Sequence, residues 1–155
     1  MLHDPDILIL RDPRESTKKC SLTPLRGLDG VEFRSYAHDR RLDAGGRILL
    51  HTDGELLGPE DAERGLLLID CNWRRVSKLR ATVDGELVLR RLPTLRTAYP
   101  RRSKDFEDPA EGLASVEALY AALAILGRPR ADLLAAYRWA DEFLDANPSI
   151  PRAAQ

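Results

Sequence analysis

The chain has 155 residues, of which 43% are hydrophobic and 32% charged, and its formal net charge is -1. This length and composition indicate a globular protein with one core or two small lobes. They exclude a membrane-spanning protein, because no stretch approaches the roughly 20 apolar residues that cross a bilayer.

The N-terminus and the cysteines indicate the compartment. Residues 1–6 lack the basic start and apolar core of a signal peptide. Cys20 and Cys71 are the two cysteines, and two do not form a disulfide framework. We therefore expect a reduced, cytoplasmic protein.

The first third of the chain predicts short strands joined by loops. Residues 6–10 form an apolar run that we interpret as a buried strand, and residues 15–20 form a polar, basic loop. Residues 23–25 predict a helix start or turn. Residues 31–36 alternate in polarity and predict an edge strand.

The middle third alternates strands with short helices. We expect strands at 47–50, 66–69 and 86–90, a turn at 51–54, and helices at 59–63 and 74–79. The run at 66–69 is apolar without alternation, which is typical of a strand buried on both faces of a parallel sheet. This order favours a small, mainly parallel α/β sheet.

The character of the chain changes after Leu92. Residues 96–111 are polar and irregular. Residues 113–126 carry apolar positions on one helix face and end at Gly127, and residues 133–144 predict a second amphipathic helix stopped by Asn147-Pro148. We therefore expect an α/β lobe over residues 1–91 and a mainly helical lobe over residues 92–155.

The residues after the strand at 66–69 are the first candidate site. Ligands of open α/β sheets bind outside the carboxyl ends of the strands, where Asp70 and Trp73 follow. The alternative is structural: Asp70 would cap the next helix and Trp73 would pack in the core. Ser115 and Glu117 open a helix that could bind a carboxylate, or they serve only as its N-terminal caps.

Basic residues cluster in one part of the chain, although the net charge is near zero. Between residues 74 and 104 only Asp84 and Glu86 are acidic. This distribution fits a nucleic-acid footprint or a solvated surface balanced by acids elsewhere. The basic residues are Arg74, Arg75, Lys78, Arg80, Arg90, Arg91, Arg96, Arg101, Arg102 and Lys104.

Metal and nucleophile patterns are weak. His3, His38 and His51 have no second ligand at zinc spacing, so we expect no metal. The sequence contains no glycine-rich phosphate loop. Cys20 and Cys71 have no evident base and acid partners and are better interpreted as small buried side chains.

Six short motifs, in order, resemble the Tsr3 family of ribosomal RNA aminocarboxypropyltransferases over nearly the whole chain. The Asp70-x-x-Trp73 pair also resembles, more distantly, the DTW-domain enzymes that act on tRNA uridine. The motifs are Lys18-Lys19-Cys20-Ser21, Pro59-Glu60-Asp61, Gly65 to Trp73, Arg91-Leu92-Pro93-Thr94-Leu95, Leu113 to Ala118, and Trp139 with Phe143-Leu144 and Asn147.

The resemblance implies a fold and an activity. The fold is SPOUT-like, with an α/β N-terminal lobe, a helical C-terminal lobe, a deep trefoil knot and a cleft between the lobes for S-adenosylmethionine. The activity is transfer of the 3-amino-3-carboxypropyl group from S-adenosylmethionine to N3 of a uridine-type nucleotide in small-subunit rRNA. The protein would be a monomer.

The resemblance also implies site residues. Asp70 is the candidate base for the uridine N3 proton, or it holds a hydroxyl of the donor. We expect RNA-backbone contacts from Lys18, Lys19, Arg74, Arg75, Arg101 and Arg102. Contacts to S-adenosylmethionine are expected from Ser21, Ile69, Asp70, Trp73, Val76, Leu92, Glu111, Ala114 and Ser115.

The chain departs from the family after Leu95. Residues 96–103 keep an Ala-x-Pro frame but lack the family's two asparagines and its Tyr-Gly pair. Three alternatives therefore stay open: a non-catalytic RNA-binding or ribosome-assembly protein on the same fold, a tRNA uridine aminocarboxypropyltransferase, and a methyltransferase.

Overall fold

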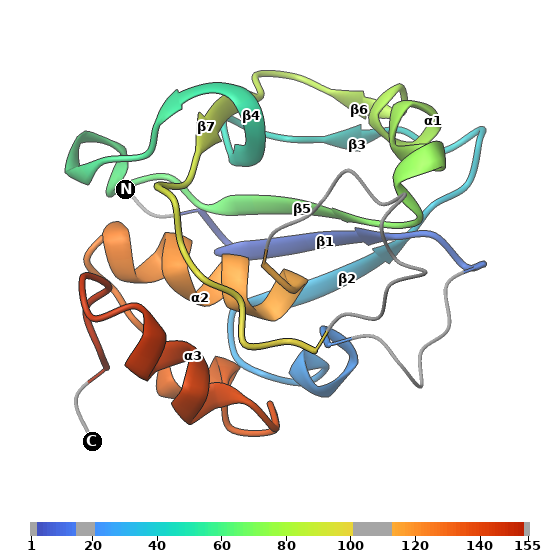
Figure 1. Cartoon of the computed structure of the whole chain (residues 1–155). Helices are drawn as coiled ribbons and strands as arrows, with labels where there is room; N and C mark the ends of the chain where they lie inside the picture. Colours follow the sequence, from blue (N-terminus) through green and yellow to red (C-terminus); the bar gives the residue numbers. More distant parts are fainter. Residues whose placement is uncertain (1–2, 15–20, 101–112, 154–155) are drawn as a thin grey trace. The chain divides into compact units, whose positions relative to one another are not determined.

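The computed structural model describes residues 3–14, 21–100 and 113–153 (Figure 1). The chain divides into two compact units. The first comprises Met1–Leu56 and Glu63–Arg91, and the second Leu57–Ala62 and Leu92–Gln155.

A five-stranded parallel sheet forms the frame of the first unit, with the order β2-β1-β5-β4-β7. A second sheet pairs two short parallel strands, β3 and β6. The strands are β1 Ile7–Arg11, β2 Val31–Ser35, β3 Leu42–Asp43, β4 Ile48–Leu56, β5 Leu66–Asp70, β6 Val83–Asp84 and β7 Val88–Arg91. The predicted mainly parallel sheet is confirmed, with the 31–36 segment as an edge strand.

The central strands are β1 and β5, and their apolar runs explain their position. Every residue of β1 is buried, as are Leu66 and Leu67 of β5. A strand that is apolar on both faces is stable only where both faces are covered, which is the environment of an interior parallel strand.

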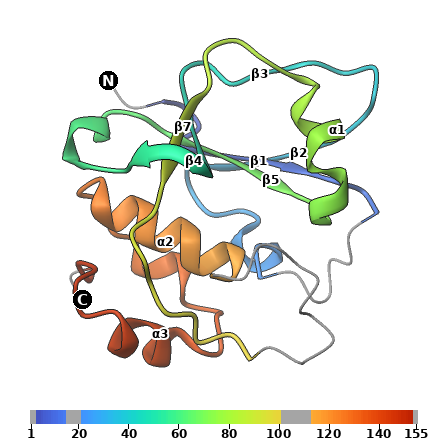
Figure 2. The same ribbon diagram turned by 45° about the horizontal axis from the view of Figure 1, so that its top comes forward.

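One face of the sheet carries a hydrophobic cluster closed by helix α1, Val76–Arg80. A 3-10 turn, η3 Trp73–Arg75, leads into this helix directly after β5, and Figure 2 shows α1 at the end of that strand. The predicted helix at 74–79 is therefore confirmed. The buried residues of the cluster are Leu8, Leu10, Leu42, Ala44, Leu67 and Leu79.

Strand β4 differs from its prediction. Residues 51–54 belong to the strand, which continues to Leu56, but they interrupt its pairing with β7, because Leu50 and Glu55 are both register partners of Arg90. Gly54 permits this irregularity, because a Cβ there would lie 2.5 Å from the backbone N of Arg90. The Asp-Gly signal thus marks an irregularity within the strand, where the backbones approach closely, and not the end of the strand.

Helix α2, Ser115–Ile125, is the longest helix among the described residues of the second unit and confirms the predicted helix. It ends at Leu126, followed by Gly127 with φ +90°. The prediction of a single apolar face is wrong, however, because eight residues of α2 are buried and they lie around most of the helix. Alanines at 121, 122 and 124 make this possible, since small side chains let neighbouring chain approach closely.

The second predicted helix is wrong over its first half. Residues 131–133 form a separate 3-10 turn, η5 Ala131–Leu133, and helix α3 spans only Ala140–Ala146. The segment between them is held by bonds that span three residues, from the N–H of Tyr137 to Leu134 O and of Ala140 to Tyr137 O. Such turns satisfy the same apolar spacing as a helix.

Two further 3-10 turns lie among the described residues. Thr23–Leu25 and Pro59–Asp61 are 3-10 turns, η1 and η2. Segment Leu57–Ala62 joins the second unit, where Arg128 Nη1 donates a 2.6 Å hydrogen bond to Ala62 O. No helix among the described residues has the length and apolar character to cross a membrane.

Candidate active site

Asp70 lies at the carboxyl end of β5 and forms an ion pair with Arg11 at the end of β1. The two residues are register partners on neighbouring parallel strands. Arg11 Nε donates to Asp70 Oδ2 at 2.8 Å, and the two side chains are only 6% and 11% exposed. The guanidinium therefore orients a carboxylate that is largely shielded from solvent.

The next turn exposes Trp73. Asn72 Oδ1 accepts a 3.0 Å hydrogen bond from the backbone N–H of Arg74, so Asn72 caps this turn. Trp73 is 40% exposed. The structural alternative for these residues is therefore wrong on both points: Asp70 is not the cap, and Trp73 does not pack in the core.

The two arginines after Trp73 have different surroundings. The guanidinium carbon of Arg74 lies 5.3 Å from the centre of the Trp73 ring, on the exposed side of the turn. Arg75 Nε donates to Asp12 Oδ2, and the Asp12 side chain is 1% exposed. Arg75 thus neutralises a buried carboxylate, whereas Arg74 faces solvent.

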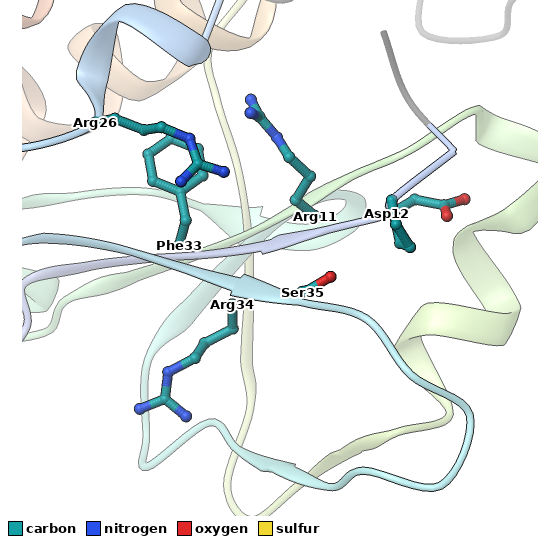
Figure 3. A pocket seen from close by; sticks show the side chains of 7 residues that line it. Arg11, Asp12, Arg26, Phe33, Arg34 and Ser35 are labelled. Carbon is teal, nitrogen blue, oxygen red and sulfur yellow. The ribbon is translucent and has the colours of Figure 1, made fainter. Parts of the chain in front are cut away.

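A pocket of about 330 Å³ opens at the ends of β1 and β2, and Arg11, the ion-pair partner of Asp70, lines it (Figure 3). The Phe33 ring contacts two guanidiniums: the central carbons of Arg11 and Arg26 lie 4.7 and 4.8 Å from its centre. Asp12, Arg34 and Ser35 also border the pocket. Arg11 therefore contacts both Asp70 and this pocket.

In the second unit, Glu117 organises the start of α2. Its side chain is fully buried, and Oε1 accepts from Ala114 N at 2.8 Å, which confirms the capping role of this residue. The same carboxylate accepts from Thr97 Oγ1, Ala98 N and Tyr137 Oη at 2.6, 2.9 and 2.9 Å. Glu117 thus joins α2 to residues 97–98.

Burial and this hydrogen bond to Glu117 raise the pKa of Tyr137 above its ordinary value. The Tyr137 ring also packs edge-on against Trp139, with ring centres 5.8 Å apart, and Tyr99 packs against Trp139 at 5.3 Å. These contacts hold the segment after Leu95 beside α3.

The remaining predicted contact residues fall in both units. Ser21, Ile69 and Val76 belong to the first and are half-buried. Leu92 and Ala114 belong to the second and are also half-buried, while Ser115 is the exposed first residue of α2. Lys18, Lys19, Arg101, Arg102 and Glu111 lie outside the described residues.

Sequence reasoning missed Arg11, Arg26 and Phe33. Arg11 could have been found, because Arg11 and Asp70 each end an apolar run and in-register parallel pairing brings such ends together. Nothing in the spacing of Arg26 and Phe33 predicted their contact. Within the described residues, no three His, Cys, Asp or Glu side chains are grouped to hold a metal ion.

Comparison with known proteins identifies the class. Residues 48–152 match the family model described as "Ribosome biogenesis protein, C-terminal". With its parallel sheet and helical second unit, the chain is therefore a ribosome biogenesis protein of this family.

Curated relatives narrow the family. The 16S rRNA aminocarboxypropyltransferase of Methanopyrus kandleri is 31% identical over 84% of this chain and 77% of its own length. That of Vulcanisaeta distributa is 30% identical over 92% and 78%. The chain belongs to the Tsr3 family of 16S rRNA aminocarboxypropyltransferases.

A solved structure agrees with this assignment. The SAM-dependent rRNA:acp-transferase Tsr3 from Vulcanisaeta distributa superimposes with a TM-score of 0.68 at 28% identity, covering 92% of this chain and 78% of that one. The mixed α/β fold expected from the resemblance is thus confirmed.

Proposed function

We propose that the protein transfers the 3-amino-3-carboxypropyl group of S-adenosylmethionine to a uridine-type nitrogen, N3, in small-subunit rRNA. The observation that carries the proposal is the similarity to 16S rRNA aminocarboxypropyltransferases over more than four-fifths of the chain. The exposed Trp73 and shielded Asp70 at the end of β5 support it.

The donor would be bound by residues from several segments of the chain. Trp73 offers an exposed apolar face beside Val76, and we propose that these side chains cover the methyl group of the sulfonium. Ser21, Ile69, Leu92, Glu111 and Ala114 would contribute further contacts. Ser115, in the first turn of α2, would direct its backbone N–H to the donor's carboxylate.

Geometry would select the group that is transferred. Bound S-adenosylmethionine supplies a sulfonium that activates all three attached carbons. If Trp73 and Val76 shield the methyl, only the first methylene of the aminocarboxypropyl arm faces the acceptor. Holding the reacting atoms in this way supplies much of the rate enhancement, because it replaces a random encounter by a fixed approach.

Asp70 would then move the proton. As N3 of the uridine bonds to the methylene carbon, the bond from that carbon to sulfur breaks and its electron pair stays on sulfur. The N3 proton passes to the Asp70 carboxylate, which Arg11 keeps oriented. In the alternative role, Asp70 would hold a donor hydroxyl and not take the proton.

The first experiment tests the donor and the product. S-adenosylmethionine should bind in calorimetry, and the modified nucleoside should gain an aminocarboxypropyl group in mass spectrometry. Trp73→Ala should weaken donor binding at least tenfold, whereas Leu56→Ala, also an exposed apolar residue, should not. Unchanged donor affinity in Trp73→Ala would contradict the shielding role.

The second experiment separates the two roles of Asp70. As the base, Asp70→Asn should lower turnover at least a hundredfold and change donor affinity little, since general-base catalysis is worth about that much. Equal losses of turnover and affinity would assign Asp70 to the donor's hydroxyl.

One observation favours a second function. Residues 96–103 lack the asparagines and the Tyr-Gly pair of the family, so a non-catalytic RNA-binding or ribosome-assembly protein on this fold is the rival. Such a protein would bind neither S-adenosylmethionine nor methylthioadenosine. Mapping modified nucleosides in rRNA and tRNA, with and without the gene, also separates an rRNA from a tRNA enzyme.

The proposal also covers the RNA contacts of the protein, its oligomeric state and its compartment. We propose that Lys18, Lys19, Arg74, Arg75, Arg101 and Arg102 contact the RNA backbone, with Arg74 the most accessible of the described pair. We further propose a monomer that works in the cytoplasm, where its rRNA substrate would be met.

A further inference from the structure

We infer that the pocket formed by Arg11, Arg26, Phe33 and Ser35 binds a phosphate group of the RNA strand next to the modified nucleotide. The inference rests on the proposed function, because it identifies part of the substrate site. None of these residues was among the expected RNA contacts.

The aromatic ring explains why the pocket takes an anion. Phe33 is in contact with the guanidiniums of both Arg11 and Arg26, so its ring is already covered and does not offer an open stacking surface. A guanidinium stacked on a ring keeps its N–H groups at the edge, where they can donate to phosphate oxygens. The hydroxyl of Ser35 adds another donor at the rim.

The charge of the pocket is positive. Its one carboxylate, Asp12, is already engaged on both oxygens. Oδ2 accepts a hydrogen bond from Arg75 Nε, and Oδ1 accepts one of 3.1 Å from the backbone N–H of Arg14. Within the described parts of the chain, Arg26 has no ion-pair partner; its guanidinium is held only by Phe33. The pocket therefore has a cation that an incoming phosphate can neutralise.

The position of the pocket points to RNA instead of a free anion. Arg11 Nε binds Asp70, and the same guanidinium contacts Phe33 on the pocket side. A phosphate bound there would lie one side chain away from the proposed base. That is the place for the backbone of the strand whose uridine approaches Asp70, and the contact would fix its register.

Arg34 provides a matched control. It follows Phe33 on β2, but Figure 3 shows its side chain pointing to the opposite side of the strand from Arg11 and Arg26. There it pairs with Glu32. Arg34 borders the same pocket. Replacing it removes one positive charge from β2 but leaves in place the two guanidiniums that contact Phe33.

The test measures binding of a labelled, mixed-sequence, 12-nucleotide single-stranded RNA at several salt concentrations. Arg26→Gln should weaken binding about tenfold, the usual worth of a charge-assisted hydrogen bond, and lower the salt dependence by about one phosphate contact. Arg26→Lys should recover part of both, and Arg34→Gln should stay within twofold of the parent.

The outcomes decide the inference. Equal effects of Arg26→Gln and Arg34→Gln would overturn it. A second result would also overturn it. If the parent protein binds inorganic phosphate, and Arg26→Gln abolishes that binding but leaves RNA affinity unchanged, the pocket serves a free anion.

Failure of the proposed function is recognised separately. In that case the parent protein would bind no S-adenosylmethionine and would transfer no group to rRNA. If the parent protein is active and Arg26→Gln matches it in both activity and RNA affinity, the pocket assignment alone is overturned.

Discussion

Arg11 and Asp70 form a shielded ion pair, and removing one partner should cost far more than removing both. Arg11→Met leaves a carboxylate that is 11% exposed without its guanidinium, so we expect a loss of about 3 kcal/mol of stability. Arg11→Met with Asp70→Leu should lose less than the sum of the single changes. Urea denaturation measures each value.

An exposed pair serves as the control. Arg41 and Asp84 are about half exposed, at 56% and 50%, and their double variant should show much weaker coupling. Additive losses at Arg11 and Asp70 would contradict their coupling.

The hydrogen bond from Tyr137 to Glu117 predicts an alkaline loss of stability. The pKa of Tyr137 is raised in the folded chain, so the phenol stays protonated while the unfolded chain ionises above about pH 10. Stability should be fully present below that pH and fall as the pH rises toward the raised value. Denaturation midpoints between pH 8 and pH 11 test this, and Tyr137→Phe should show a flatter decline.

Of the contacts made by Glu117, the sequence predicted the local one and not the distant ones. Glu117 follows Ala114 by three residues, so its capping bond was foreseeable from local spacing. Its bonds from Thr97 and Tyr137, 20 residues away on either side, depend on how the chain returns, which no local pattern records.

At the scale of elements, the apolar runs were the reliable signal. β1 and β5 were predicted because a buried parallel strand must be apolar on both faces. The bounds of β4 and α3 were not predicted correctly. Polar residues continue β4 beyond Leu50, and the apolar spacing over 133–144 is compatible with turns as well as with a helix.

Gly54 should be intolerant of any side chain. A Cβ there would lie 2.5 to 2.7 Å from backbone atoms of Leu89 and Arg90, and backbone in a paired strand cannot move aside. We expect Gly54→Ala to cost about 2 kcal/mol by overpacking. In the control, Gly58→Ala, the new Cβ meets only the flexible carboxylate of Glu60, so thermal denaturation should change much less.

At the scale of the whole molecule, the proposed donor contacts come from segments far apart in the sequence. Trp73 and Asp70 belong to the first, Leu92 and Ser115 to the second. A ligand at a hundred times its Kd stabilises the state that binds it by about 2.7 kcal/mol. We therefore expect S-adenosylmethionine to slow amide hydrogen exchange at the end of β5 and at the start of α2; unchanged exchange at either segment would contradict the contact proposed there.

The two units are not continuous in the sequence. Segment Leu57–Ala62 lies between two strands of the first unit but belongs to the second, where Arg128 bonds to Ala62 O. A boundary drawn by composition cannot show such an exchange. The trefoil knot implied by the resemblance stays a prediction, since ordinary connection rules do not favour one.

The edge position of β2 has a consequence for solubility. An outermost strand offers backbone groups to which another molecule can add a strand, and charged side chains on it oppose that addition. On β2 these charges are Glu32 and Arg34, which pair with each other. Exchanging both for valine would leave an apolar, uncharged margin, and concentrated solutions should then precipitate as β-rich aggregates visible by light scattering.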